Sequence, residues 1–207
     1  MKVALINYGM GNLGSVRRTL EDLGVDVVIA EHPARLLDAH RIVLPGVGAF
    51  REGMERLRTG DWLEALQRQV VEGGKPLLGI CLGMQMLSSS SEEDGLNAGL
   101  DFIPGRVRLL RSLGCALRIP HVGWNEVNHR EGSPLFDQIP QAMDFYFVHS
   151  YAFEVDDPRS LAATTDYGVT VTAAVCRRHV FGTQFHPEKS SKAGRRLLRN
   201  FLEFVPC

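Results

Sequence analysis

The sequence predicts an α/β fold: a single-domain three-layer sandwich with a parallel core sheet, antiparallel strands that extend it, and helices on both faces. The first half alternates short apolar runs with amphipathic stretches, the order of strand–helix–strand units with parallel strands. The second half contains short alternating segments rich in Val, Thr and Phe, which is typical of antiparallel strands. A length of 207 residues suits one ordinary domain, so we expect one domain over 1–207.

In the first half, each predicted strand is a short apolar run and each predicted helix has apolar residues at helical spacing. The runs VDVVIA and RIVL are the clearest strands. The serines at 88–91 lie inside a predicted helix. In chain order we expect a strand at 2–7, a helix at 12–24, strands at 25–30 and 41–44, a helix at 61–72, a strand at 76–80 and a helix at 83–91.

In the second half, six segments are predicted to add antiparallel strands to the core. A closing helix is expected at 191–204, with Ser190 or Ser191 as its N-cap. Ligands of open parallel sheets bind beyond the carboxyl ends of the strands, so the chemistry is expected in the loops that leave those ends. The six segments are 104–110, 121–128, 143–149, 161–166, 169–176 and 180–185, with a turn at 166–168.

Composition excludes several classes of protein. Hydrophobic residues make up 44% and charged residues 23%, so the chain has enough apolar surface for a core and is not disordered. A net charge of −1 offers no general attraction to nucleic acid or anionic membranes. No stretch approaches the ~18 apolar residues of a membrane helix, and the opening apolar run is too short for a signal peptide. The widely spaced cysteines predict no metal site, no disulfide framework and a cytoplasmic location; they are Cys81, Cys115, Cys176 and Cys207.

A candidate nucleophile lies in the segment Gly79-Ile80-Cys81-Leu82-Gly83, between a predicted strand and a predicted helix. This is the G-x-nucleophile-x-G pattern with cysteine as the nucleophile. Such a residue sits on a strained, sharp turn where side chains two positions away would clash, which explains the glycines. A helix N-terminus at the sulfur favours the thiolate. The alternative is a small buried cysteine beside packing glycines.

A cysteine nucleophile needs a base that a third group orients. Among the seven histidines, His186 follows a predicted strand and begins His-Pro-Glu. Pro187 favours extended geometry at His186, which places His186 and Glu188 on the same side of the chain. The sequence therefore predicts a Cys81–His186–Glu188 triad, whereas an isolated His-Pro-Glu would be only a polar turn.

The third strand is followed by Pro45-Gly46-Val47-Gly48, where glycines leave backbone N–H groups accessible. One of these groups, with the amide of Leu82, could hold the oxyanion of a tetrahedral intermediate. A plain glycine-rich turn before a helix is the alternative.

A second glycine motif favours different chemistry. Gly9, Gly11 and Gly14 form a G-x-G-x-x-G after the first strand, and Glu31 follows the second strand, as in dinucleotide-binding units. The alternative is that these glycines only make a tight turn and permit close packing. A dinucleotide-binding module thus remains a rival interpretation.

Four segments resemble the class I, triad-type glutamine amidotransferases: PGVGAF, GICLGMQ, FVHSY and QFHPEKS. Three segments resemble, more narrowly, the glutaminase subunits of imidazole glycerol phosphate synthases: NYGMGNL at 7–13, PHVGWN at 120–125 and HPEKS at 186–190. The resemblance runs from about residue 3 to 204. It implies that Cys81 attacks the glutamine amide to give a thioester and ammonia, with His186 and Glu188 as its partners and no cofactor. The implied oxyanion and substrate-binding residues are Gly46, Val47, Gly48, Leu82, Gln85, Glu93, His149, Ser150 and Tyr151.

The resemblance also implies a partner, a (β/α)8-barrel cyclase subunit that uses the ammonia to make imidazole glycerol phosphate and an aminoimidazole carboxamide ribotide. It further suggests a chain that is nearly idle alone, with Pro45-Gly48 as the switch. Rival interpretations are the glutaminase of another amidotransferase and an inactive regulatory subunit. The implied docking residues are Asn12, His121, Trp124, Tyr146 and Lys189.

Overall fold

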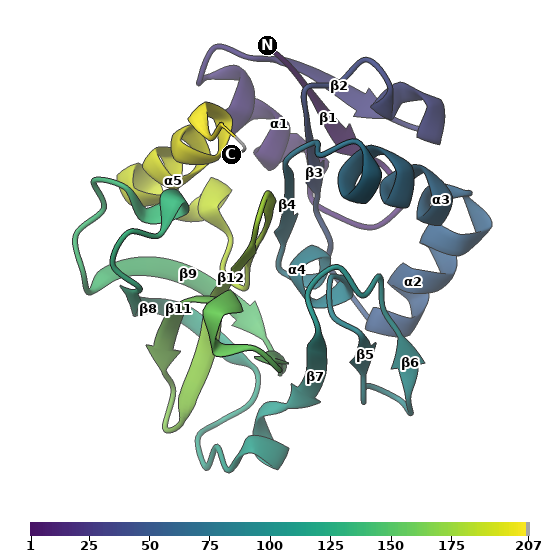
Figure 1. The fold of residues 1–207 in the computed structure, drawn as a ribbon. Helices are drawn as coiled ribbons and strands as arrows, with labels where there is room; N and C mark the ends of the chain where they lie inside the picture. Colours follow the sequence, from purple (N-terminus) through teal and green to yellow (C-terminus); the bar gives the residue numbers. More distant parts are fainter. Residues whose placement is uncertain (206–207) are drawn as a thin grey trace.

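The computed structural model describes residues 1–205; Cys207 lies outside the described residues. Within them, one nine-stranded sheet has the order β2-β1-β3-β4-β13-β12-β11-β8-β9, and a four-stranded sheet has the order β10-β7-β5-β6 (Figure 1). No helix of this region is long and apolar enough to cross a membrane. The same residues contain no group of three or more His, Cys, Asp or Glu side chains that could hold a metal ion.

The parallel half of the large sheet follows the predicted strands closely. Apart from the edge strand β2, which is mostly half-buried, its strands are almost fully buried and are apolar runs. One expectation holds only in part: the segment predicted at 180–185 pairs antiparallel with β12 on one side, as expected, but in parallel with β4 on the other. The parallel strands are β1 (Lys2–Ile6), β2 (Asp26–Ala30), β3 (Arg41–Leu44), β4 (Leu77–Ile80) and β13 (Val180–Thr183).

Antiparallel strands extend this half, as the sequence predicts, and their register places Trp124 opposite Tyr146. They are β12 (Thr170–Arg177), β11 (Leu161–Asp166), β8 (His121–His129) and β9 (Met143–His149). The segment predicted at 104–110 belongs instead to the small sheet, where it pairs with a strand that the sequence analysis missed. The small sheet contains β10 (Tyr151–Val155), β7 (Gly105–Leu109), β5 (Ser90–Ser91) and β6 (Asn97–Ala98).

Helices cover both faces of the large sheet. One apolar cluster joins α1 (Leu13–Glu21) and α5 (Ser191–Glu203) to one face. A second cluster joins α2 (Phe50–Thr59), α3 (Trp62–Leu66) and α4 (Leu82–Met86) to the other. The structure is thus the predicted three-layer arrangement. Further helical turns are the π-helix Gln67–Glu72 and the 3-10 turns Pro33–Leu36, Leu110–Leu113, Pro134–Phe136, Pro158–Ser160 and Pro187–Lys189.

One local expectation about helices was wrong, and a second holds for the residue's position but not for its hydrogen bond. The helix predicted at 83–91 ends at Met86, because the carbonyls of Met86 and Leu87 accept hydrogen bonds from residues 100–103 and the chain turns into β5. Ser190 stands at the N-cap position of α5, but its hydroxyl does not cap the helix. That hydroxyl donates to the carbonyl of His186 and accepts from the amide of Tyr146, so it ties the loop after β13 to β9.

Candidate active site

Cys81 occupies the sharp turn between β4 and α4, with φ 55° and ψ −110°. A non-glycine residue adopts this conformation only where its surroundings enforce it, as at nucleophile elbows. A Cβ on Gly83 would lie 1.9 Å from the carbonyl oxygen of Leu44, and one on Gly79 would lie 2.6 Å from the carbonyl oxygen of Gly83. The glycines are therefore required because backbone passes directly beside them.

The turn presents the sulfur of Cys81 to β9 and to the end of β13. The amide of Cys81 donates to the carbonyl of Thr183 at 2.7 Å, which holds the turn against β13. Its Sγ lies 3.7 Å from the carbonyl oxygen of Val148, and the side-chain amide of Gln184 approaches Sγ at 3.7 Å. Cys81 is only 7% exposed, yet it lines a cavity, so a small substrate can reach it.

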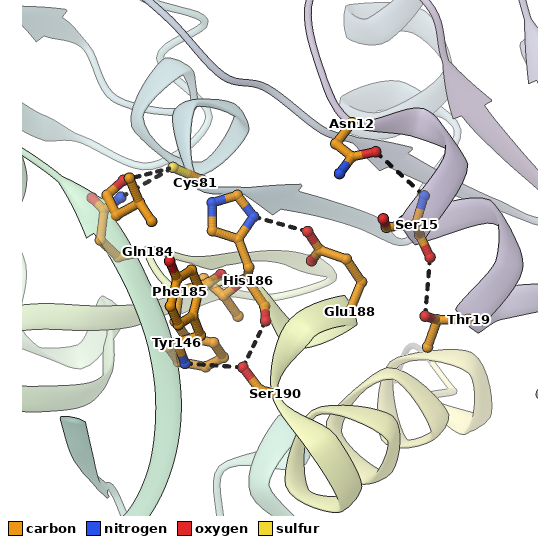
Figure 2. A network of polar contacts seen from close by, with 12 residues as sticks. Asn12, Ser15, Thr19, Cys81, Tyr146, Gln184, Phe185, His186, Glu188 and Ser190 are labelled. Atoms are coloured by element: carbon orange, nitrogen blue, oxygen red, sulfur yellow. Dashed lines mark hydrogen bonds and ion pairs between the residues drawn. The ribbon is translucent and has the colours of Figure 1, made fainter. Parts of the chain in front are cut away.

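The imidazole of His186 lies between Cys81 and Glu188 (Figure 2). Its Nδ1 is 2.8 Å from Oε1 of Glu188, and these side chains are 5% and 1% exposed. Burial lowers the pKa of His186, but the thiol of Cys81 and the carboxylate of Glu188 outweigh burial and raise that pKa to about 9. The ring is therefore well placed to carry the proton of the thiol, with Glu188 fixing its orientation.

The segment Pro45–Gly48 runs beside the elbow. Gly48 has φ 106°, a conformation that favours glycine. Within residues 1–205, the amides of Gly46, Val47 and Gly48 donate no hydrogen bond to a backbone carbonyl. Val47, Gly48 and Leu82 line the cavity, whereas Gly46 is buried behind it. The segment thus brings N–H groups without a backbone acceptor to the cavity that Cys81 lines, and their oxyanion role stays a prediction.

A cavity of about 380 Å³ contains most of the residues that the sequence analysis selected for substrate binding. It brings them together from α4, from the loop before β6 and from the junction of β9 and β10. Its volume falls within the usual range for small-molecule sites. The lining residues are Val47, Gly48, Cys81, Leu82, Gln85, Glu93, Pro120, Val148, His149, Ser150, Tyr151, His186 and Lys189.

Gln184 is a buried contact of the site that the sequence analysis missed. Its Nε2 approaches Sγ of Cys81, and its Oε1 accepts from Nε2 of Gln85 at 3.0 Å. Nε2 of Gln85 also donates to the carbonyl of Tyr151 at 3.1 Å. Alternation along an extended segment could have revealed Gln184, because it is two positions before His186 and faces the same side.

Glu93 lies at the cavity with its carboxylate against the start of α2. Its Oε2 accepts from the amide of Phe50 at 2.8 Å, in a helix whose N-cap Ala49 supplies no side-chain bond. Burial raises the pKa of Glu93, the bond from Phe50 opposes that shift, and the charge of Asp94 adds to it. One carboxylate oxygen thus anchors the helix that follows the Pro45–Gly48 segment.

The predicted docking residues separate into an exposed group and a buried one. Trp124 is 52% exposed and packs edge-on against Tyr146, with ring centroids 5.9 Å apart. Nζ of the exposed Lys189 lies 5.7 Å from the centroid of Tyr146. Asn12 is exposed at the N-cap of α1. The side chain of His121, in contrast, is 2% exposed, so a partner could not contact it directly.

His121 belongs to a buried hydrogen-bond chain that ends at the cavity. Nδ1 of His149 lies 2.8 Å from the carbonyl oxygen of Tyr151 and must donate to it, so Nε2 of His149 accepts from Nδ1 of His121 at 2.9 Å. Asn125 then donates to Nε2 of His121 at 3.3 Å. Burial lowers the pKa of His121 to about 4 and of His149 to about 3, so both rings stay neutral. They position the backbone of Tyr151.

The G-x-G-x-x-G loop packs against the Pro45–Gly48 segment. A Cβ on Gly11 would lie 3.4 Å from Pro45, and one on Gly48 would lie 2.8 Å from Cε of Met10. At Gly9, a Cβ would lie 2.5 Å from the guanidinium of Arg56, so a side chain already occupies that approach. The tight-turn interpretation holds for Gly9 and Gly11, because their φ angles are 87° and 141°, which favour glycine. At Gly14, in contrast, the space within 4 Å is open, so close packing does not require a glycine there.

Comparisons with known proteins agree with this geometry. A family model described as glutamine amidotransferase class-I matches residues 4–204. Two curated relatives, both called imidazole glycerol phosphate synthase subunit HisH, are 45% identical to this chain. The match to the protein from Syntrophotalea carbinolica covers 96% of this chain and 98% of that protein. The match to the protein from Moorella thermoacetica covers 98% of this chain and 95% of that protein. A solved glutamine amidotransferase has a TM-score of 0.76 at 19% identity over 97% of both chains. The structure of PurLQS from Thermotoga maritima has a TM-score of 0.76 at 17% sequence identity, again over 97% of both chains.

Proposed function

Because the chain belongs to the class-I glutamine amidotransferase family, we propose that it hydrolyses L-glutamine to glutamate and ammonia as the glutaminase subunit of imidazole glycerol phosphate synthase, in histidine biosynthesis. The relatives named for that synthase, at 45% identity over nearly the full length, support this assignment. One observation carries the chemistry: a strained cysteine faces a buried imidazole that a carboxylate holds at 2.8 Å.

The reaction follows from the positions of these three groups. His186 takes the thiol proton, and the Cys81 sulfur attacks the side-chain amide carbon of glutamine. Amides of Leu82 and of the Pro45–Gly48 segment stabilise the oxyanion. His186 then gives its proton to the departing nitrogen, which leaves as ammonia, and a thioester to Cys81 remains. Water adds to the thioester while His186 accepts its proton, and the products are glutamate and the free thiol.

The cavity provides for the amino-acid end of glutamine. Oε1 of Glu93 is free to accept from the substrate ammonium group, since Oε2 is bound to Phe50. The carboxylate and side-chain amide of the substrate are expected at Gln85 and at the backbone of Ser150 and Tyr151, which line the same space. Glutamine is thereby oriented with its amide at the sulfur.

The exposed aromatic and apolar residues around the cavity mouth form the proposed docking face for a partner subunit. Val122 is 55% exposed, and it adjoins Trp124 on β8. A mouth covered by a partner would direct ammonia to that subunit rather than to water. We assign the partner as a (β/α)8-barrel cyclase and the product pair as imidazole glycerol phosphate and an aminoimidazole carboxamide ribotide.

The cytoplasm is the proposed location, because Cys81, Cys115 and Cys176 are unpaired thiols.

Mass-tagging with an electrophilic glutamine analogue, 6-diazo-5-oxo-norleucine, tests the proposed chemistry. The analogue should add one adduct at Cys81, faster when the cyclase subunit is present, and Cys81→Ser should take up none. Cys176 provides the internal control, because burial raises the pKa of its thiol to about 11. Tagging at Cys176 but not at Cys81, or no glutamate release by the complex, would refute the proposal.

A further inference from the structure

Tyr8 carries a buried hydroxyl that the proposed mechanism does not use. The residue follows β1 and is 6% exposed. Among residues 1–205, its Oη has no hydrogen-bond partner. A buried polar group left in this state costs about 1–3 kcal/mol, so it requires an explanation.

The hydroxyl is directed at the oxyanion segment. A Cβ built on Gly46 would lie 2.6 Å from Oη of Tyr8, and the same point lies 2.9 Å from Cβ of Leu82 and 3.0 Å from the amide nitrogen of Gly83. Tyr8, Gly46 and the start of α4 therefore meet within one small volume, beside the residue that follows the nucleophile. Glycine at position 46 leaves room for the hydroxyl to stand against the backbone.

The phenol retains its proton in this environment. Burial and the charge of Cys81 raise the pKa of Tyr8, and the opposing effect of Arg56 is smaller. The hydroxyl is thus a donor without an acceptor. The adjacent segment is weakly restrained, because within residues 1–205 the amides of Gly46, Val47 and Gly48 donate to no backbone carbonyl. Rotation of one peptide in this segment would exchange the places of its carbonyl and its N–H at little conformational cost to the glycines.

We propose that Tyr8 is a positioning residue of the oxyanion site, whose hydroxyl donates to a peptide carbonyl of Pro45–Gly48 when the segment adopts its glutamine-hydrolysing conformation. This inference rests on the proposed glutaminase function. Turning that carbonyl toward Tyr8 directs the N–H of the same peptide away from Tyr8 and toward Cys81. The hydroxyl is unpaired in the resting arrangement and paired in the active one, so it shifts the equilibrium toward activity.

Loss of one hydrogen bond should change the equilibrium between the resting and active conformations of Pro45–Gly48 by about 2- to 12-fold. Tyr8→Phe should therefore lower kcat for glutamine in the complex with the cyclase subunit by about that factor. KM should be nearly unchanged, because Tyr8 does not line the cavity. Synthesis from added ammonium salt should be unchanged as well, since it bypasses glutamine hydrolysis.

Stability provides a second readout, because a tyrosine whose hydroxyl stabilised the resting fold would lose stability when that hydroxyl is removed. Removing an unpaired buried hydroxyl should raise the melting temperature of the isolated chain by about 2–4 °C. Ser133→Ala is the matched control, because Oγ of Ser133 is likewise buried and without a partner but lies outside the site. That variant should gain stability and keep the kcat of the parent chain.

The inference is supported if Tyr8→Phe raises the melting temperature and lowers kcat, while Ser133→Ala raises only the melting temperature. An unchanged kcat, or a lower melting temperature for Tyr8→Phe, overturns it. Absence of Cys81-dependent glutamine hydrolysis in the parent complex would refute the proposed function itself, which is a distinguishable result.

Discussion

Replacing Glu188 by Gln provides the most direct test of the proposed relay. The substitution keeps the shape of the side chain and removes its charge. In the parent chain, Oε1 of Glu188 accepts from Nδ1 of His186 at 2.8 Å, and both side chains are almost fully buried. Water cannot replace the lost carboxylate at such a position, so the effect should appear in full.

The size of the effect follows from the contact. A hydrogen bond to a charged group contributes about 1.5–3 kcal/mol, which corresponds to about 10- to 150-fold in rate. Without the carboxylate, the pKa of His186 should fall from about 9, because one of the groups that raise it is lost. Oε2 of Glu188 has no partner within residues 1–205, so the new amide would bring a donor into a place without an acceptor.

The assay is glutamate release by the complex with the proposed cyclase subunit, measured beside synthesis from ammonium salt. We expect kcat for glutamine to fall by the stated factor while the ammonium-dependent rate holds. The carbon-13 NMR titration of His186 should show a lower midpoint in Glu188→Gln. A fall in kcat of less than about 3-fold, together with an unmoved titration midpoint, would refute the assignment of Glu188 as the orienting group.

Three further perturbations test other parts of the site. The pKa of His186 is about 9 in the folded state and about 6.5 in the unfolded state, so its contribution to stability is full below pH ~6.5 and is lost as pH rises through ~9. The free energy of unfolding, measured in urea, should therefore fall over this pH range. The same pH dependence in His186→Gln would contradict this expectation. Cys81→Ala should abolish glutamine-dependent synthesis and spare the ammonium-dependent rate; residual glutamate release would exclude Cys81 as the nucleophile. Glu93→Gln should raise KM for glutamine about 10-fold or more with a smaller effect on kcat, because the amide oxygen can still accept from the amide of Phe50. Glu93→Ala should lower kcat as well. Equal effects in the two variants would argue against separate roles for Glu93 in substrate binding and in anchoring α2.

The sequence was sufficient for the elements whose local pattern matches their final environment. The strand before Cys81 is a continuous apolar run because it is buried on both faces, and the glycines at 79 and 83 mark the elbow because backbone adjoins them. The triad could be predicted from its residue types and spacing, but the expected extended geometry holds only for His186. Pro187–Lys189 form a 3-10 turn, through which the carboxylate of Glu188 reaches Nδ1 of His186.

What the sequence did not reveal depends on contacts between distant segments. The Ser88–Ser91 run leaves its predicted helix because the carbonyls before it bind residues 100–103. The strand β13 joins the two halves of the sheet: it is antiparallel to β12 but parallel to β4, and no local pattern records the pairing with β4. His121 was expected at a surface, yet the structure stacks its ring between Phe147 and Tyr167, with centroids 4.7 and 3.9 Å away.

The site combines fixed and adjustable parts, and their distribution indicates where control acts. Cys81 is held by its amide bond to Thr183 and by the close backbone contact at Gly83, and His186 is held by Glu188. The Pro45–Gly48 segment has no comparable restraint from its own amides. Elements that change conformation come from such weakly bonded regions. We therefore expect the proposed partner to act on the oxyanion donors, because displacing the nucleophile or the base would require breaking buried contacts.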